Sequence, residues 1–174
     1  MTARKLQSPR RRRRSGGNAM IEWMLVILPT LGIITAFFDV SFALFSWSTL
    51  QNAVREGVRY AITFQTSGSL GQDASIAQVV ATNSMGLLTS SSTLIKVNYY
   101  TTTAPTTAIA APNGNDPGNL VVVSVQQYPL VWLVPISGTC CGPGSYRAQS
   151  PASINVYSSD ILGGYPAGET SVTR

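Results

Sequence analysis

One carboxylate stands at the start of a long apolar stretch, in "RRRRRSGGNAMIEWMLVILP" (residues 10–29). It belongs to Glu22, the fifth residue after Gly17. A carboxylate at the edge of a bilayer costs a few kcal/mol unless a cation compensates it, so Glu22 is a candidate functional residue whose chemistry is charge pairing. Alternatively, Glu22 lies at the level of the lipid headgroups or in the first turn of a helix, where its charge favours the helix N-terminus.

The chain offers no set of residues for catalysis. It contains no histidine, the commonest general base and metal ligand, and its acidic residues are scattered singly. The two cysteines, Cys140 and Cys141, are adjacent. Without a histidine to activate a thiolate, any role that they have is expected to be a vicinal disulfide that stiffens a loop, or contact with another exported subunit, rather than catalysis. The sequence therefore predicts no enzyme, no cofactor, no metal site and no small-molecule substrate.

Charge is divided unevenly along the chain. Seven of the twelve basic residues lie before Gly17, where no acidic residue occurs. From Asn18 onward, five basic residues face seven acidic ones, which leaves a net charge of 5 − 7 = −2. No aromatic residue is interleaved with the arginines of residues 10–14, and the orientation of a membrane span already accounts for them. We therefore expect no nucleic-acid partner.

Residues 23–47 are predicted to span a membrane once. The stretch has Asp39 as its only charged residue, and as a helix it would reach about 37 Å, enough for a hydrocarbon core of about 30 Å. Trp23 and Trp47 suit the two interfaces, and the preceding arginines keep the N-terminus in the cytoplasm and export the remainder. A cleaved secretory signal would have a shorter apolar region and a small-residue cleavage site.

The start of the chain combines a glycine, a glutamate, a proline and a late acid in the apolar run with a segment N-A-x-R-E-G-x-R-x-A. The residues of this pattern are Gly17, Glu22, Pro29, Asp39, Asn52, Ala53, Arg55, Glu56, Gly57, Arg59 and Ala61. The opening stretch is similar to the processing site of type IV prepilins, and the whole pattern resembles the TadE-like family of minor pilins or pseudopilins of the tight-adherence (Tad) pilus system. Asn18 and Trp23 depart from the usual residues of that family.

This resemblance implies a leader of residues 1–17, removed after Gly17 by a prepilin peptidase so that the mature chain begins at Asn18. In related filaments, the glutamate neutralises the new α-amino group of a neighbouring subunit. The implied partners are other pilin or pseudopilin subunits, the pilus assembly platform and the lipids of a bacterial inner membrane. The implied function is that of a minor pilin or pseudopilin, assembled by N-terminal helix packing for adhesion or secretion, with an extracellular pilus as its final location. The alternative is an unprocessed single-pass envelope protein whose exported domain binds a partner.

A single helix over residues 18–64 must position these side chains, since no proline or turn signal occurs in its second half. Pro29 removes one backbone hydrogen bond and predicts a kink. Asp39 lies about 26 Å along the helix from Glu22, near the outer interface, where it would bond a neighbouring helix or contact water.

Small residues recur every fourth position in the second half of this helix, at Ala53, Gly57 and Ala61. They form one smooth face on which another element can pack closely. On a different face, Glu56 and Arg59 have the i,i+3 spacing of a helical ion pair. We expect the small face to be used for helix packing and the charged face to be solvated.

Residues 65–174 are predicted to form an exported α+β domain. Apolar periodicity favours a helix over 73–89 and strands near 94–101, 120–128 and 153–158. Because each element has one apolar face, a three-stranded antiparallel sheet should pack on the exported half of the long helix and shield its small-residue face. The predicted fold class is therefore α+β and pilin-like, with a long N-terminal membrane helix on a small antiparallel sheet and a second short helix.

Overall fold

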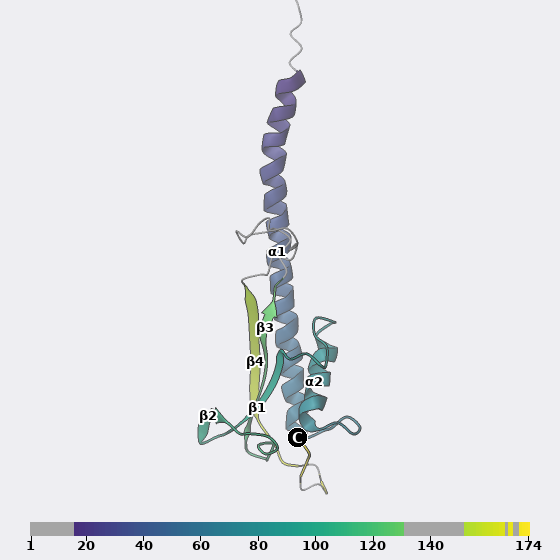
Figure 1. The fold of residues 1–174 in the computed structure, drawn as a ribbon, viewed down its shortest axis with the longest axis vertical. Coiled ribbons are helices and arrows are strands. Elements are labelled where there is room, and N and C mark those ends of the chain that lie inside the picture. Colours follow the sequence, from purple (N-terminus) through teal and green to yellow (C-terminus); the bar gives the residue numbers. More distant parts are fainter. Residues whose placement is uncertain (1–15, 131–151, 166, 169–170) are drawn as a thin grey trace, which may run out of the picture.

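The structure, a computed structural model, describes residues 16–130, 152–165, 167–168 and 171–174. Its longest element is the helix α1, Gly16–Ile62, of 47 residues. One half of α1 stands clear of the rest of the described chain and the other half packs on a folded body (Figure 1). Phe64, in the left-handed region with φ 52°, follows the end of the helix and turns the chain back toward the body.

The second helix, α2, runs over Gln72–Asn83 and is shorter than the prediction of 73–89. Ser84 ends it: its buried hydroxyl donates to the Ala81 carbonyl at 2.7 Å and accepts from the Leu88 amide at 3.0 Å. Met85 and Gly86 then adopt positive φ values, which an α-helix cannot contain. Leu88 is still buried in the core. The burial expected for this apolar residue is therefore confirmed, but its expected place in the helix is wrong.

The sheet is antiparallel throughout and has the order β2-β1-β3-β4. The strands are β1 Ile95–Thr101, β2 Ala104–Ala108, β3 Leu120–Pro129 and β4 Ser153–Ile161. The expectation of three strands is therefore wrong by one, because β2 extends the sheet at its β1 edge. All five residues of β2 are exposed, so β2 is held by backbone pairing alone. Its sequence therefore lacks the alternation of apolar and polar residues by which a half-buried strand is predicted.

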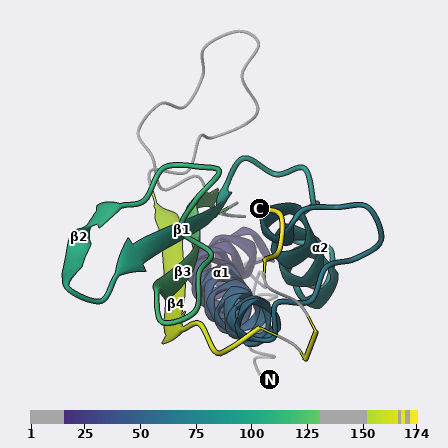
Figure 2. The ribbon, with the colours of Figure 1, turned by 90° about the horizontal axis from the view of Figure 1, so that it is seen from below.

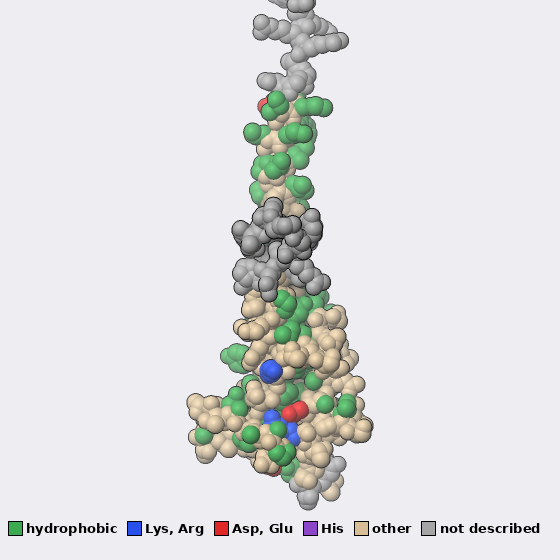
Figure 3. Space-filling model, viewed as in Figure 1, with side chains coloured by type: hydrophobic (Ala, Val, Ile, Leu, Met, Phe, Trp, Pro, Cys, Tyr) green, Lys and Arg blue, Asp and Glu red, His purple; other side chains and the backbone are tan. Residues whose placement is uncertain are grey.

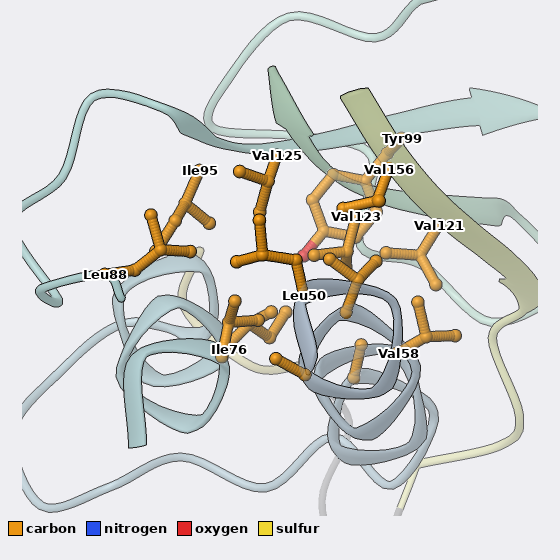
Figure 4. Close-up of a cluster of buried hydrophobic side chains, with 14 of the residues drawn as sticks. Leu50, Val58, Ile76, Leu88, Ile95, Tyr99, Val121, Val123, Val125 and Val156 are labelled. Carbon is orange, nitrogen blue, oxygen red and sulfur yellow. The ribbon is translucent and has the colours of Figure 1, made fainter. Parts of the chain in front are cut away.

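The body has two layers, with α1 and α2 side by side against one face of the sheet (Figure 2). The ladders set Ile95 opposite Val125 and Tyr99 opposite Val121, so the apolar side chains of neighbouring strands share this face. Figure 4 shows these side chains meeting those of the two helices. The completely buried members of this core are Leu50, Ala53, Val54, Ala61, Ile76, Val80, Tyr99, Val121, Val123 and Val125. The predicted α+β, pilin-like arrangement of a long apolar helix on an antiparallel sheet with a second short helix is confirmed.

Candidate assembly surface on the long helix

The first half of α1, residues 19–45, exposes large apolar side chains at nearly every position. Figure 3 shows part of this apolar surface on the face in view. A helix that is apolar all round is unsuited to water and suited to a bilayer or to the interior of a helix bundle. α1 is also long and apolar enough to cross a membrane. The exposed side chains include Met20, Ile21, Trp23, Met24, Leu25, Leu28, Leu31, Ile33, Phe37, Phe38, Leu44 and Phe45.

Hydroxyl groups in this half bond to their own helix. Thr30 donates to the Val26 carbonyl at 2.7 Å, and Ser41 donates to the Phe37 carbonyl, also at 2.7 Å. A polar group with an internal partner can face lipid without the cost of an unsatisfied donor. These residues therefore do not conflict with a membrane or bundle environment.

The residues of the predicted processing site lie at the start of α1. Gly17 and Asn18 are within the helix, and residues 1–15 of the expected leader lie outside the described residues. Glu22 is exposed and has no ion pair within the part of the chain that the structure describes. Because α1 begins at Gly16, Glu22 lies beyond the first turn, where a helix N-terminus favours negative charge only weakly. The helix end therefore compensates little of the Glu22 charge.

Asp39 differs from Glu22 in its surroundings. Only 6% of Asp39 is exposed, although its neighbours along the helix are largely uncovered. The two environments expected for Asp39, a bond to a neighbouring helix or contact with water, stay predictions. Pro29 lies inside the exposed half and does not end the helix, and the kink expected there stays a prediction.

The small-residue face of α1 lies inside the body. Ala53 and Ala61 are completely buried, and a Cβ at Gly57 would lie 2.5 Å from Cγ2 of Val80. Val80 belongs to α2, whereas the nearest sheet atom, in Val123, would be 3.7 Å away. The sheet contacts this face as expected, but α2, which the expectation left out, makes the closest approach at Gly57. A second helix can approach so near because glycine has no side chain.

The opposite face of the packed half carries charge. Arg59 Nη1 lies 3.1 Å from Glu56 Oε1, which confirms the expected i,i+3 pair. Three quarters of the Arg59 side chain is exposed, so solvent screens the pair and its contribution to stability is small. α1 thus carries three different surfaces: an apolar exposed half, a small-residue packing face and a solvated charged face.

Sequence reasoning missed a polar cluster that fixes α2 to the sheet. Asp73 accepts hydrogen bonds from the Tyr99 hydroxyl and from Arg174 Nε, both at 2.8 Å. The Arg174 guanidinium lies 4.5 Å from the centre of the Tyr99 ring. Burial, together with the adjacent Asp73 carboxylate, raises the pKa of Tyr99 well above its usual range. These three residues are separated by up to 101 positions, so no sequence spacing indicates that they meet.

A second buried amide pair lies beside this cluster. Gln72 donates to the Ala61 carbonyl at 3.0 Å, and its side-chain oxygen accepts from Asn115 at 2.9 Å. Asn115 also donates to the Val172 carbonyl at 2.7 Å. The end of α1, the start of α2 and residues 171–174 are therefore joined by satisfied buried polar groups, which specify one packing arrangement.

Comparison with known proteins gives one similarity, and it lies in the long helix. The family model described as TadE-like protein matches residues 17–59. Residues 17–59 are similar to the TadE-like family. No curated protein and no solved structure gave a match.

The TadE-like segment begins at the predicted processing glycine, Gly17, and extends through the Glu56–Arg59 pair. It therefore contains the whole exposed half of α1 and most of the packed half, and confirms the resemblance seen in the sequence. This similarity suggests a component of the Tad pilus machinery. Cys140 and Cys141 lie outside the described residues, and the disulfide stays a prediction.

Proposed function

We propose that this TadE-like protein is a minor pilin or pseudopilin of a Tad-type pilus, made as a precursor and processed after Gly17 by a prepilin peptidase. One observation carries the proposal: half of a TadE-like helix is apolar and exposed on all sides, while its other half is fixed in a folded body. The exposed half first spans the inner membrane in a single pass, with the N-terminus in the cytoplasm. It then packs laterally against other pilin subunits on the assembly platform, and the filament serves adhesion or secretion.

Glu22 supplies the negative charge that is paired in this assembly. It has no ion pair among the described residues, and an uncompensated carboxylate in the bilayer is unfavourable. Cleavage after Gly17 creates an α-amino group on Asn18, and in the assembled filament this cation lies beside Glu22 of a neighbouring subunit. Pairing of the two charges in a low-dielectric environment favours the assembled state over the isolated subunit.

Processing is tested on protein extracted from membranes of cells that contain the prepilin peptidase. Intact mass and N-terminal sequencing are expected to show Asn18 as the first residue, and replacement of Gly17 is expected to leave the full leader in place. A mature chain that still begins at Met1 would contradict the proposal. It would favour the alternative of an unprocessed envelope protein whose exported domain binds a partner.

Assembly is tested separately with Glu22→Ala. The variant should insert and be cleaved as the unaltered chain is, yet be depleted from sheared filament fractions by about tenfold, since one charge pair per subunit is lost. Glu56→Ala is the matched control, because it removes an acid from the solvated face of the same helix. Equal recovery of the Glu22 and Glu56 variants in filaments would refute the pairing.

A further inference from the structure

The face of the sheet that points away from α1 and α2 carries polar and aromatic side chains. Residues on this face alternate with the core residues, and they surround an open hollow of about 430 Å³. The hollow is formed across β1, β3 and β4. The side chains that matter for its chemistry are Asn98, Tyr100, Ser124, Asn155 and Tyr157.

The lining of the hollow is uncharged. Its polar groups are amides and hydroxyls, and Lys96 lies on the same face but outside the hollow. Tyr157 is 70% exposed, which makes it the most exposed aromatic residue of the described body beyond α1. A charged ligand would find no counter-charge here, and an apolar ligand would leave the amides without partners, at a cost.

Several hydrogen-bonding groups in the hollow are available to a ligand. The Asn98 side chain has no hydrogen-bond partner within the described ranges. The side-chain oxygen of Asn155 accepts from the Gln127 amide at 2.7 Å, which orients its NH₂ group without using it. Amides can both donate and accept, so these positions suit a ligand rich in hydroxyl groups.

The backbone beneath the hollow is held in place from two sides. A bulge interrupts the β3–β4 ladder between Val125 and Tyr128, and Gln127 within it has φ 57°, a conformation that costs energy for a residue other than glycine. From α1, Gln51 donates to the Tyr157 carbonyl at 3.2 Å. The aromatic and amide groups are thus carried on rigid strands rather than on loops, which lowers the entropic cost of binding.

We propose that this hollow binds a segment of a neutral polysaccharide. Sugar rings present apolar C–H faces that can stack on Tyr157 and Tyr100, and hydroxyl groups that can bond Asn98 and Asn155. From the ladder registers, the two tyrosines lie about 16 Å apart, two strands across and four residues along, so they would contact different sugar units of one chain. The hollow lies on the sheet face opposite α1, so the inference does not depend on processing or on helix assembly.

Calorimetric titration of the full chain tests the proposal, in a zwitterionic detergent because sugar-based detergents would compete. The probes are cellohexaose and chitohexaose, compared with glucose and hexagalacturonate. We expect at least one neutral hexasaccharide to bind about tenfold or more tighter than glucose, and Tyr157→Ala to weaken that binding about tenfold. Tyr157→Phe keeps the ring and should stay within about threefold of the unaltered chain, as should Met85→Ala, which changes an exposed residue next to α2.

Three outcomes would overturn the proposal. The first is no heat of binding for either neutral hexasaccharide at millimolar concentration, and the second is equal affinity of Tyr157→Ala and the unaltered chain. The third is exclusive binding of hexagalacturonate, which would assign recognition to Lys96 and an acidic ligand. If, within the second outcome, Tyr157→Ala also alters self-association in sedimentation, this face of the sheet contacts a second copy of the chain. The measurement uses unprocessed protein, so its failure is distinct from failure of the pilin proposal.

Discussion

The two halves of α1 share one continuous helix and differ in how their side chains are distributed around it. Residues 19–45 are apolar on every side and largely exposed, whereas residues 46–62 bury a single stripe against α2 and the sheet. The stripe follows helical spacing, and charged residues such as Arg55 and Arg59 occupy the other side. Both halves are helical, so secondary structure does not distinguish them. The environment of each half depends on whether its apolar residues surround the helix or form a single stripe along it.

A charge placed in each half of α1 should have the largest effect, on the stability of the body in one half and on membrane insertion in the other. Leu50→Asp buries an unpaired carboxylate at a completely buried position and should destabilise the body by more than about 4 kcal/mol. Ile34→Asp lies at an exposed position near the centre of the predicted span, so it should leave the unfolding of the body unchanged and reduce membrane insertion. Urea unfolding followed by limited proteolysis, together with carbonate extraction of membranes, measures the two effects. Equal behaviour of the two variants in both assays would contradict the division.

A methyl group added to each half gives the next largest contrast. In Gly57→Ala the new Cβ would meet Val80 at 2.5 Å, so α2 must shift and the body should lose about 1–3 kcal/mol of stability. Gly32→Ala is the matched control, since a Cβ there meets nothing within 4 Å. The difference in urea midpoint between the two variants is the measurement. An unchanged midpoint for Gly57→Ala would show that α2 does not approach α1 as closely as the structure indicates.

The polar cluster around Tyr99 predicts a pH dependence that belongs to the body alone. The folded state raises the pKa of Tyr99 above its usual 10.0, so the unfolded chain loses this proton first as the pH rises. Stability from this group is therefore fully present below about pH 10 and falls by up to about 1.4 kcal/mol per pH unit above it. Urea unfolding between pH 9 and pH 11 should show this slope, and Tyr99→Phe should flatten it. Persistence of the full slope in the variant would assign it to other groups.

The smallest effect should come from the solvated face of the packed half. Glu56→Ala removes the partner of a largely exposed arginine, so the free energy of unfolding should change by less than about 0.5 kcal/mol. A thermal or urea midpoint close to that of the unaltered chain is the expected result. A loss comparable with that of Gly57→Ala would mean that this face is packed rather than solvated.

Sequence reasoning succeeded where one local pattern was sufficient. The uninterrupted apolar run predicted the long helix, and the small residues at every fourth position marked the face that α1 packs inward at Gly57. It failed where the outcome depended on distant partners. β2 is paired only through its backbone to β1, and α2 ends early because Ser84 finds hydrogen-bond partners on both sides of the turn.

The sequence by itself determined the membrane-length helix, the glycine, glutamate and arginine pattern that marks the TadE-like segment, and the α+β class of the body, because each of these rests on spacing along a short stretch of chain. Only the tertiary structure decided that α2 rather than the sheet lies closest to Gly57, that Asp73 meets Tyr99 and Arg174, and that tyrosines and amides from three strands surround one hollow. The physical reason is that these contacts join residues far apart in the chain, and strand order and helix crossing bring them together only when the core is packed.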